Sequence, residues 1–269
     1  MIIYAPAKVN LHLRLLGKRS DGYHDIETIF ERIALFDKIT LRSLKSNKIK
    51  ISCDDPEVPR GKSGLVYKAA ELLKNKFGIT KGIDIKIVKK IPIAAGLGGG
   101  SSDTACILTG LNKLWKLGLS AGELSPLGKR LGADIPFFIG GASFAAGIGR
   151  GDEISPIRWR KKFWHFLITP PIKLLSGDIY RACKNKKHTR AFISNDLEEA
   201  VLKIAPLVAK LKSALEEMGL THSLVSGSGP SVFSLFSKRK EAVRAKKVLI
   251  KQFPFVRNKG WKIFIVSTM

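Results

Sequence analysis

The chain has 269 residues, 45% of them hydrophobic, which is enough for a packed core in one large domain or two small ones. It has no run of about eighteen apolar residues and no recognisable secretory leader, so we expect no membrane span. Its three cysteines are well separated, which argues against a disulfide framework, and we expect a cytoplasmic protein. The formal net charge of +25 would attract phosphates, nucleic acid or acidic membranes, but its spread along the chain fits a lysine-rich solvated surface.

The first half of the chain combines predicted strands and helices. Apolar residues recur at every second position from 9 to 15, which indicates a half-buried strand and places Lys8 and Asn10 on one face. Helices are expected over residues 65–77 and 101–117, and a glycine follows each of them. A third helix is expected from Ser120, where Glu123 completes a capping box and Pro126 distorts the turn. Further strands are expected at residues 26–35, 38–42, 48–52 and 83–87.

The second half has a different order of elements. Strands are expected at residues 163–169, 222–226, 231–236 and 262–267. Helices are expected at residues 176–183, from 195–198 onward, from Pro206 to before Gly219, and at residues 240–253. The order is β-α-β-β-α-β with one extra helix, which predicts a split βαβ, ferredoxin-like layer with a domain boundary near residue 155.

A glycine-rich loop between a predicted strand and a predicted helix is the sharpest signal. Glycines let a backbone approach a ligand, consecutive N–H groups can cradle a phosphate, and the following helix adds its dipole. The simpler alternative is a hinge in which Ser101 is an ordinary N-cap. Residues 61–63 lack the first glycine of a P-loop, and Ser101 stands where a dinucleotide fingerprint needs glycine. The predicted nucleotide-binding residues are Pro92, Ile93, Ala94, Ala95, Gly96, Leu97, Gly98, Gly99, Gly100, Ser101 and Ser102.

One acidic residue, Asp134, lies in an otherwise small and apolar segment, residues 132–138. A lone carboxylate there is unfavourable unless it is paired or functional, and a structural cap or salt bridge is the alternative. Lys8 taken alone fits a solvated surface lysine. A pair between Lys8 and Asp134 would keep the carboxylate ionised and able to accept a proton from a hydroxyl group.

Two further segments carry weaker signals. Tyr23 and His24 follow a predicted turn, and such rings can stack on a base or bond to its edge, although ordinary packing explains a lone pair equally well. Residues 226–231 form either a plain hairpin turn or a second glycine wall that faces the first loop. The histidines show no metal-ligand spacing, so no protein metal site is expected.

Together these segments resemble the GHMP kinase family over essentially the whole chain. The resemblance rests on residues 6–11, 21–24, 92–103, 132–138, 195–198 and 226–229. It implies an α+β, two-domain fold, with an ATP-binding α/β domain of the ribosomal S5 domain 2-like type at residues 1–155 and a ferredoxin-like domain at residues 156–269. The active site would then lie in the cleft between the two domains.

The resemblance also implies a set of roles for individual residues. Asp134 would act as the general base and Lys8 would polarise the hydroxyl group and stabilise charge on the phosphoryl group. Asn10, Tyr23 and His24 would bind the substrate, with the two rings at its cytidine end. ATP with Mg²⁺ would be the donor, and the acceptor would be cytidine diphosphate methylerythritol of the non-mevalonate isoprenoid pathway. The sequence departs from the family at Gly64, where an asparagine usually helps to hold adenine.

Two alternatives remain open: another member of the same family and a protein of a different class. A homoserine or mevalonate type of kinase would share the glycine loop without needing a cytidine pocket. An RNA-binding protein would use the basic surface, although no recognised RNA motif is present. We expect a monomer or homodimer with a small-molecule substrate, no nucleic-acid partner and no membrane partner.

Overall fold

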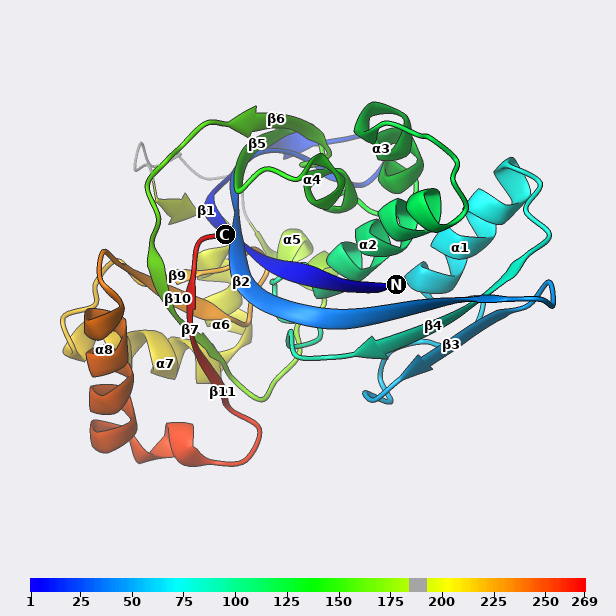
Figure 1. Cartoon of the computed structure of the whole chain (residues 1–269). Coiled ribbons are helices and arrows are strands. Elements are labelled where there is room, and N and C mark those ends of the chain that lie inside the picture. Colours follow the sequence, from blue (N-terminus) through cyan, green and yellow to red (C-terminus); the bar gives the residue numbers. More distant parts are fainter. Residues whose placement is uncertain (184–192) are drawn as a thin grey trace.

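The computed structural model describes residues 1–183 and 193–269 and contains two β-sheets with helices packed against them (Figure 1). The larger sheet has seven strands and the smaller sheet has four. The predicted two-domain α+β architecture is therefore confirmed. No helix within the described residues is long and apolar enough to span a bilayer.

Two long antiparallel strands, β1 (Ile2–Lys18) and β2 (His24–Leu44), form the centre of the larger sheet. Residues 5–11 of β1 are all buried, so the expected half-buried strand is wrong over this stretch. The reason is that helix α2 packs on one face and the smaller sheet packs on the other. The strands expected at residues 26–35 and 38–42 form one strand, because Phe36 and Asp37 continue the pairing with β1.

The remaining strands of this sheet are short. Strand β4 pairs antiparallel with β2 and parallel with β3, and β5 joins β2 to β6. Sequence patterns did not predict β5, β6 or β8. The five strands are β3 (Ile49–Cys53), β4 (Gly82–Val88), β5 (Phe144–Ile148), β6 (Glu153–Ile157) and β8 (Ser194–Asn195).

Four helices lie on one face of the larger sheet (Figure 1). The predicted capping box between Ser120 and Glu123 is present at the start of α3. Helix α2 begins two residues earlier than expected and ends at Leu114, because Lys116 takes a positive φ of 55°. The helices are α1 (Leu65–Lys76), α2 (Gly99–Leu114), α3 (Ala121–Lys129) and α4 (Ile135–Gly140), the last of which was not predicted.

The smaller sheet has the strand order β11-β7-β10-β9 with antiparallel neighbours, which is the order of a ferredoxin-like layer. Its strands are β7 (Trp164–Thr169), β9 (Leu224–Val225), β10 (Val232–Phe236) and β11 (Lys262–Ser267). Strand β9 is shorter than the expected strand at 222–226. The helices are α5 (Ser176–Ala182), α6 (Glu198–Ile204), α7 (Pro206–Glu217), α8 (Arg239–Gln252) and the unpredicted 3-10 helix η1 (Pro254–Arg257).

The two halves of the chain are joined by more than the covalent connection. Strand β8, from the second half, pairs parallel with β1, where Leu13 lies opposite Asn195. His165 lies 3.0 Å from the Glu31 carboxylate, and both side chains are fully buried. The expected boundary near residue 155 falls inside β6, and its position stays a prediction.

Candidate active site

A cavity of about 1620 Å³ lies where the two halves of the chain meet. Its lining comes mainly from β1, the 18–24 turn, the 57–66 segment, the glycine loop, Asp134, α5 and the 227–228 turn, and it also includes Lys89, Asp103 and Arg150. All the sequence-predicted site residues line this cavity except Ser102. Ser102 is fully buried, and its hydroxyl oxygen has no hydrogen-bond partner among the described residues. The fold therefore gathers segments that are far apart in the sequence.

The first glycine loop needs glycine for two physical reasons. Gly96 and Gly98 take positive φ values of 74° and 67°. A Cβ atom on Gly96 would lie 2.0 Å from the Ser226 carbonyl oxygen, and one on Gly98 would lie 3.0 Å from the Lys8 side chain. The loop leads into α2 at Gly99, so its backbone N–H groups and the helix start face the same region. This arrangement fits a phosphate-binding loop.

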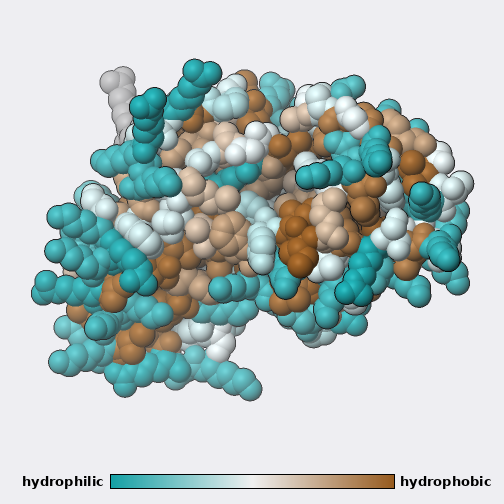
Figure 2. Space-filling view, viewed as in Figure 1, coloured by the Kyte–Doolittle hydropathy of each residue, from teal (hydrophilic) through white to brown (hydrophobic). Residues whose placement is uncertain are grey.

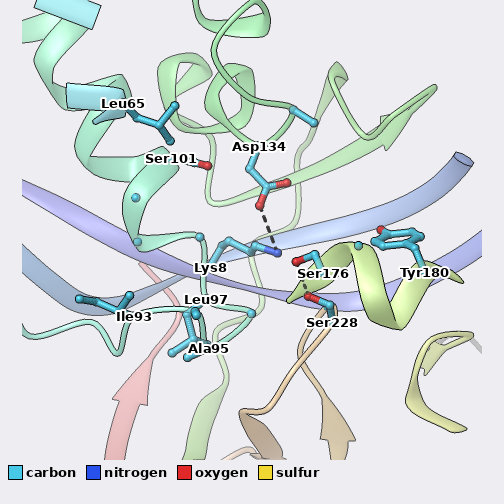
Figure 3. A pocket seen from close by; sticks show the side chains of 18 of the residues that line it. Lys8, Leu65, Ile93, Ala95, Leu97, Ser101, Asp134, Ser176, Tyr180 and Ser228 are labelled. Atoms are coloured by element: carbon cyan, nitrogen blue, oxygen red, sulfur yellow. Dashed lines mark hydrogen bonds and ion pairs between the residues drawn. The ribbon is translucent and has the colours of Figure 1, made fainter. Parts of the chain in front are cut away.

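Lys8 and Asp134 lie together beside the glycine loop, as Figure 3 shows. The Lys8 Nζ atom is 3.4 Å from Asp134 Oδ2 and donates a hydrogen bond of 2.6 Å to Asn10 Oδ1. Asn10 in turn donates to the Thr28 hydroxyl at 2.8 Å. Lys8 and Asn10 are nearly fully buried, whereas the Asp134 side chain is 29% exposed. The carboxylate is thus the member of the group that remains open to the cavity.

Asp134 is positioned by helix α4, which begins at the next residue. The buried Arg32 side chain donates hydrogen bonds of 2.6 Å to the carbonyl oxygens of Phe137 and Phe138, near the end of that helix. Burial lowers the pKa of Arg32 to about 10. Arg32 is a supporting residue that the sequence did not reveal, since an isolated arginine in a strand carries no motif.

Aromatic side chains line the end of the cavity beyond Lys8. The rings of His24 and Tyr180 lie 5.4 Å apart, and the Arg150 guanidinium lies 5.1 Å from the centre of the Tyr23 ring. Burial is the main cause of the raised pKa of Tyr180. Sequence reasoning found Tyr23 and His24 but missed Tyr180 and Arg150, which lie in segments without a recognisable motif.

The second glycine turn faces the first, and this confirms one of the two interpretations of residues 226–231. The Ser226 hydroxyl donates to the Gly96 carbonyl oxygen at 2.9 Å, and the Ser231 N–H donates to the Ala95 carbonyl oxygen at 3.3 Å. The hydroxyl groups of Ser228 and Ser176 are 2.7 Å apart (Figure 3). The two turns therefore form opposing walls in direct contact.

Asn195 supports the second turn from behind. Its Nδ2 group donates to the carbonyl oxygens of Val225 and Gly227 at 2.9 and 2.7 Å, while its Oδ1 accepts from the Leu197 N–H. The neighbouring Glu198 accepts from the Val225 N–H at 2.7 Å. The 195–198 segment, which the sequence marks as a motif, thus holds the turn without lining the cavity.

A buried charge cluster lies beneath the first glycine loop. Lys89 Nζ bonds to Asp37 and lies 2.8 Å from Asp103 Oδ2, and all three side chains are almost fully buried. Asp37 also accepts the backbone N–H groups of Lys90 and Ile91 at 2.6 and 2.8 Å. Burial raises the pKa of Asp103 to about 7, and its Oδ1 atom has no partner among the described residues.

The departure from the family at Gly64 has a steric explanation. Gly64 lines the cavity and precedes α1 without a side-chain cap. A Cβ atom at this position would lie 2.4 Å from the Pro59 carbonyl oxygen. In this chain the 59–64 loop therefore excludes any larger side chain, and the loop backbone forms this part of the wall.

Comparisons with known proteins agree with this geometry. The profile described as "GHMP kinases N terminal domain" matches residues 64–142, and "GHMP kinases C terminal" matches residues 177–254. A 4-diphosphocytidyl-2-C-methyl-D-erythritol kinase of Bacillus mycoides (strain KBAB4) is 40% identical over 87% of this chain and 88% of its own length. The enzyme of that name from Syntrophotalea carbinolica is 37% identical over 98% of this chain and 97% of its own.

Solved structures show the same fold. A crystal structure of a 4-(cytidine 5'-diphospho)-2C-methyl-D-erythritol kinase has a TM-score of 0.83 and 28% identity, covering 99% of this chain and 98% of that chain. A homoserine kinase from Cytophaga hutchinsonii ATCC 33406 has a TM-score of 0.77 and 19% identity, covering 100% of this chain and 95% of that chain. The second likeness supports the fold alone.

Proposed function

Because the chain belongs to the GHMP kinase family, we propose that it transfers the γ-phosphoryl group of ATP to the 2-hydroxyl group of 4-diphosphocytidyl-2-C-methyl-D-erythritol. This is a step in non-mevalonate isoprenoid precursor biosynthesis. The observation that carries the proposal is the Lys8–Asp134 pair, 3.4 Å apart, between the glycine loop and the aromatic end of the cavity. A cytoplasmic location and a monomeric or homodimeric state stay predictions.

The proposed reaction is an in-line phosphoryl transfer. Asp134 accepts the proton of the substrate hydroxyl, the hydroxyl oxygen forms a bond to the γ-phosphorus, and the bond between that phosphorus and the β–γ bridging oxygen breaks to release ADP. Lys8 offsets the negative charge of Asp134 and of the transferring group. Its hydrogen bond to Asn10 holds the ammonium group in place.

The glycine loop is the proposed phosphate site, and Mg²⁺ is the proposed companion of ATP. The described residues contain no group of three or more His, Cys, Asp and Glu side chains that could hold a metal ion. Magnesium often takes most of its ligands from phosphate oxygens and water, and one carboxylate suffices from the protein. Because Asp134 serves as the proton acceptor, the ion would take its ligands from the phosphate oxygens and from water. The ion would neutralise charge on the phosphates.

The other end of the cavity is the proposed cytidine site. Tyr23, His24 and Tyr180 present aromatic rings there, and a nucleobase gains stacking energy from such rings. Arg150 adds a cation beside them. A homoserine or mevalonate substrate carries no base, so this aromatic end favours the cytidyl substrate over those alternatives.

The test is ADP release with ATP, Mg²⁺ and three separate alcohols: the cytidyl substrate, homoserine and mevalonate. We expect release with the cytidyl substrate only, and loss of at least a thousandfold in kcat for Asp134→Asn with both substrates still bound. Asp84→Asn, on β4 and outside the cavity lining, is the matched control. Release with another alcohol only would disprove the substrate, and near-normal turnover of Asp134→Asn would disprove the base.

A second variant tests the cytidine site alone. His24→Ala is expected to raise the KM for the cytidyl substrate at least tenfold while the KM for ATP stays within twofold, since the His24 ring packs near Tyr180, which lies apart from the glycine loop (Figure 3). An unchanged KM for the cytidyl substrate would contradict the placement of the base beside His24.

A further inference from the structure

One segment near the end of the chain carries more positive charge for its length than the chain as a whole. Of the 25 residues from 238 to 262, ten are lysine or arginine and one, Glu241, is acidic, so this segment carries a formal charge of +9 of the total +25. It comprises α8, η1 and the start of β11. None of its residues lines the cavity. The proposed kinase site therefore gives no reason for this charge.

The basic side chains of α8 form one stripe. Lys240, Arg244, Lys247 and Lys251 follow each other at intervals of four, three and four residues, and all four are exposed. This spacing places them on a single face of the helix. The opposite face is apolar and buried against the smaller sheet through Ala242, Ala245 and Leu249. We call these four residues the α8 basic stripe.

The α8 basic stripe has no counter-charge on the described part of the chain. None of its four residues forms an ion pair there. Glu241 accepts the Lys238 N–H in the capping box at the helix start, so it is already engaged. Like charges at these spacings repel one another and destabilise a helix. An external polyanion would remove that repulsion.

Neighbouring residues extend the charged surface. Arg257, on η1, donates hydrogen bonds to the carbonyl oxygens of Ile250 and Lys251, which fixes η1 at the end of α8. Lys259 and Lys262 follow and are exposed. Figure 2 shows hydrophilic side chains gathered over the region of α8, at the lower left of the molecule.

We propose that the α8 basic stripe is a docking surface for the phosphate backbone of single-stranded RNA. The Cβ atoms of residues three and four apart on a helix are about 5–6 Å apart, so long flexible Lys and Arg side chains in one row can each reach a different phosphate of a single strand. A duplex presents its phosphates in two rows on either side of a groove about 12 Å wide, and a single row of cations matches that less well. Binding would release counterions and would carry no base specificity.

The α8 basic stripe fits a membrane surface or a protein partner less well. A helix that binds a membrane surface inserts apolar side chains, but no large apolar side chain in residues 238–262 is exposed. Protein interfaces are often centred on large aromatic anchors, and no large aromatic side chain in residues 238–262 is fully exposed for that role. The partner that fits this surface best is therefore a flexible polyanion that binds the basic side chains through charge alone.

The test is the binding of fluorescein-labelled U20 RNA by fluorescence anisotropy between 50 and 300 mM KCl. The variant replaces Lys240, Arg244, Lys247 and Lys251 with glutamine. We expect at least tenfold weaker binding at 100 mM KCl, and a slope of log K against log salt reduced by about 3, since each single-strand phosphate contact contributes roughly 0.7. Kinase turnover should stay unchanged, which shows that the variant is folded.

The matched control has the same change of charge elsewhere. The control residues are one arginine and three lysines, all exposed, at the end of β2, in the loop that follows it and on β3: Arg42, Lys45, Lys48 and Lys50. Their replacement with glutamine should weaken RNA binding less than threefold. Equal losses in the two variants would overturn the proposal, because net charge would then be the only cause. No RNA binding by the wild type at 100 mM KCl, or tighter binding to duplex DNA or anionic vesicles, would overturn it as well.

Discussion

The two glycine turns that meet at the cavity are held by different kinds of group. The first, residues 92–102, lies above the buried ionic cluster of Asp37, Lys89 and Asp103. The second, residues 226–231, is held mainly by the neutral amide of Asn195, and the Glu198 carboxylate accepts the adjoining Val225 N–H. Charged support depends on protonation and on every partner being present, whereas amide support does not titrate. The difference predicts that pH and single substitutions affect the two walls differently.

The largest effect is expected from Lys89→Met. This change leaves Asp37 and Asp103 buried without their cation, and such a loss costs about 3–5 kcal/mol of unfolding free energy. Urea denaturation measures it. Lys90→Met is the control, because Lys90 is exposed and should change stability by no more than about 0.5 kcal/mol. Equal stability of the two variants would show that the cluster does not support the first loop.

Asn195→Ala tests the neutral support of the second turn. The variant loses three hydrogen bonds, and we expect its free energy of unfolding to fall by about 2 kcal/mol. We also expect a higher KM for the alcohol substrate, because Gly227 lies against Asn10 and Lys8. Asn112→Ala is the matched control: Asn112 makes two hydrogen bonds to Leu119 outside the cavity. It should lower stability with unchanged kinetic constants. Equal kinetic effects would remove the link between Asn195 and the site.

The pH dependence of the free energy of unfolding also distinguishes the ionic support of the first turn from the amide support of the second. The pKa of Asp103 is raised from 3.8 to about 7 by burial, so the folded state holds this proton where the unfolded state has lost it. The contribution of the protonated Asp103 side chain to the free energy of unfolding is complete below about pH 4 and is lost as the pH rises through 7. Asp103→Asn stays neutral, so its stability relative to wild type should increase from pH 5 to pH 7.5 by at least about 1.4 kcal/mol.

Three groups surround Asp103 in that experiment: Lys89 and Asp37 from neighbouring elements and Cys106 from α2 itself. Burial raises the pKa of Cys106 to about 12, so this thiol does not titrate in the window. Asn195→Ala provides the comparison and should show a constant offset from wild type over the same range. A flat difference curve for Asp103→Asn would contradict the titration of Asp103.

The smallest effect concerns strain in the first turn. Ala94 takes a φ of 50°, whereas the positive φ values in the second turn fall on Gly227 and Gly229. Ala94→Gly relieves about 1–2 kcal/mol of strain but adds freedom to the unfolded chain, so a net gain below 1 kcal/mol, or about 2 °C in Tm, is expected. Ala95→Gly, at a buried position with ordinary φ, should be destabilising. A loss of Tm for Ala94→Gly would refute the strain.

The sequence predicted best what lies in one continuous segment. The glycine loop, the capping box at Ser120, and the strands and α-helices of the smaller sheet were recognisable from local patterns. It also placed Lys8 and Asn10 on one strand face, which the hydrogen bond between them confirms.

The features that the sequence did not reveal depend on contacts between residues that are far apart in the chain. Lys89 and Asp103 look like ordinary surface residues until β2 brings Asp37 beside them. Arg32 and Tyr180 have no motif, because their neighbours in space come from other segments. The full burial of β1 was missed for the same reason, since both of its faces are covered by elements that follow much later.

The pairing of β8 with β1 has a consequence for the growing chain. The Leu15 N–H donates to the Asp196 carboxylate over a separation of 181 residues. At about 5–20 residues per second, synthesis needs roughly 10 to 35 s to produce that partner. Until then the edge of β1 offers unpaired backbone groups to any strand nearby. The nascent first half is therefore most exposed to aggregation along the edge that will later carry the active-site cavity.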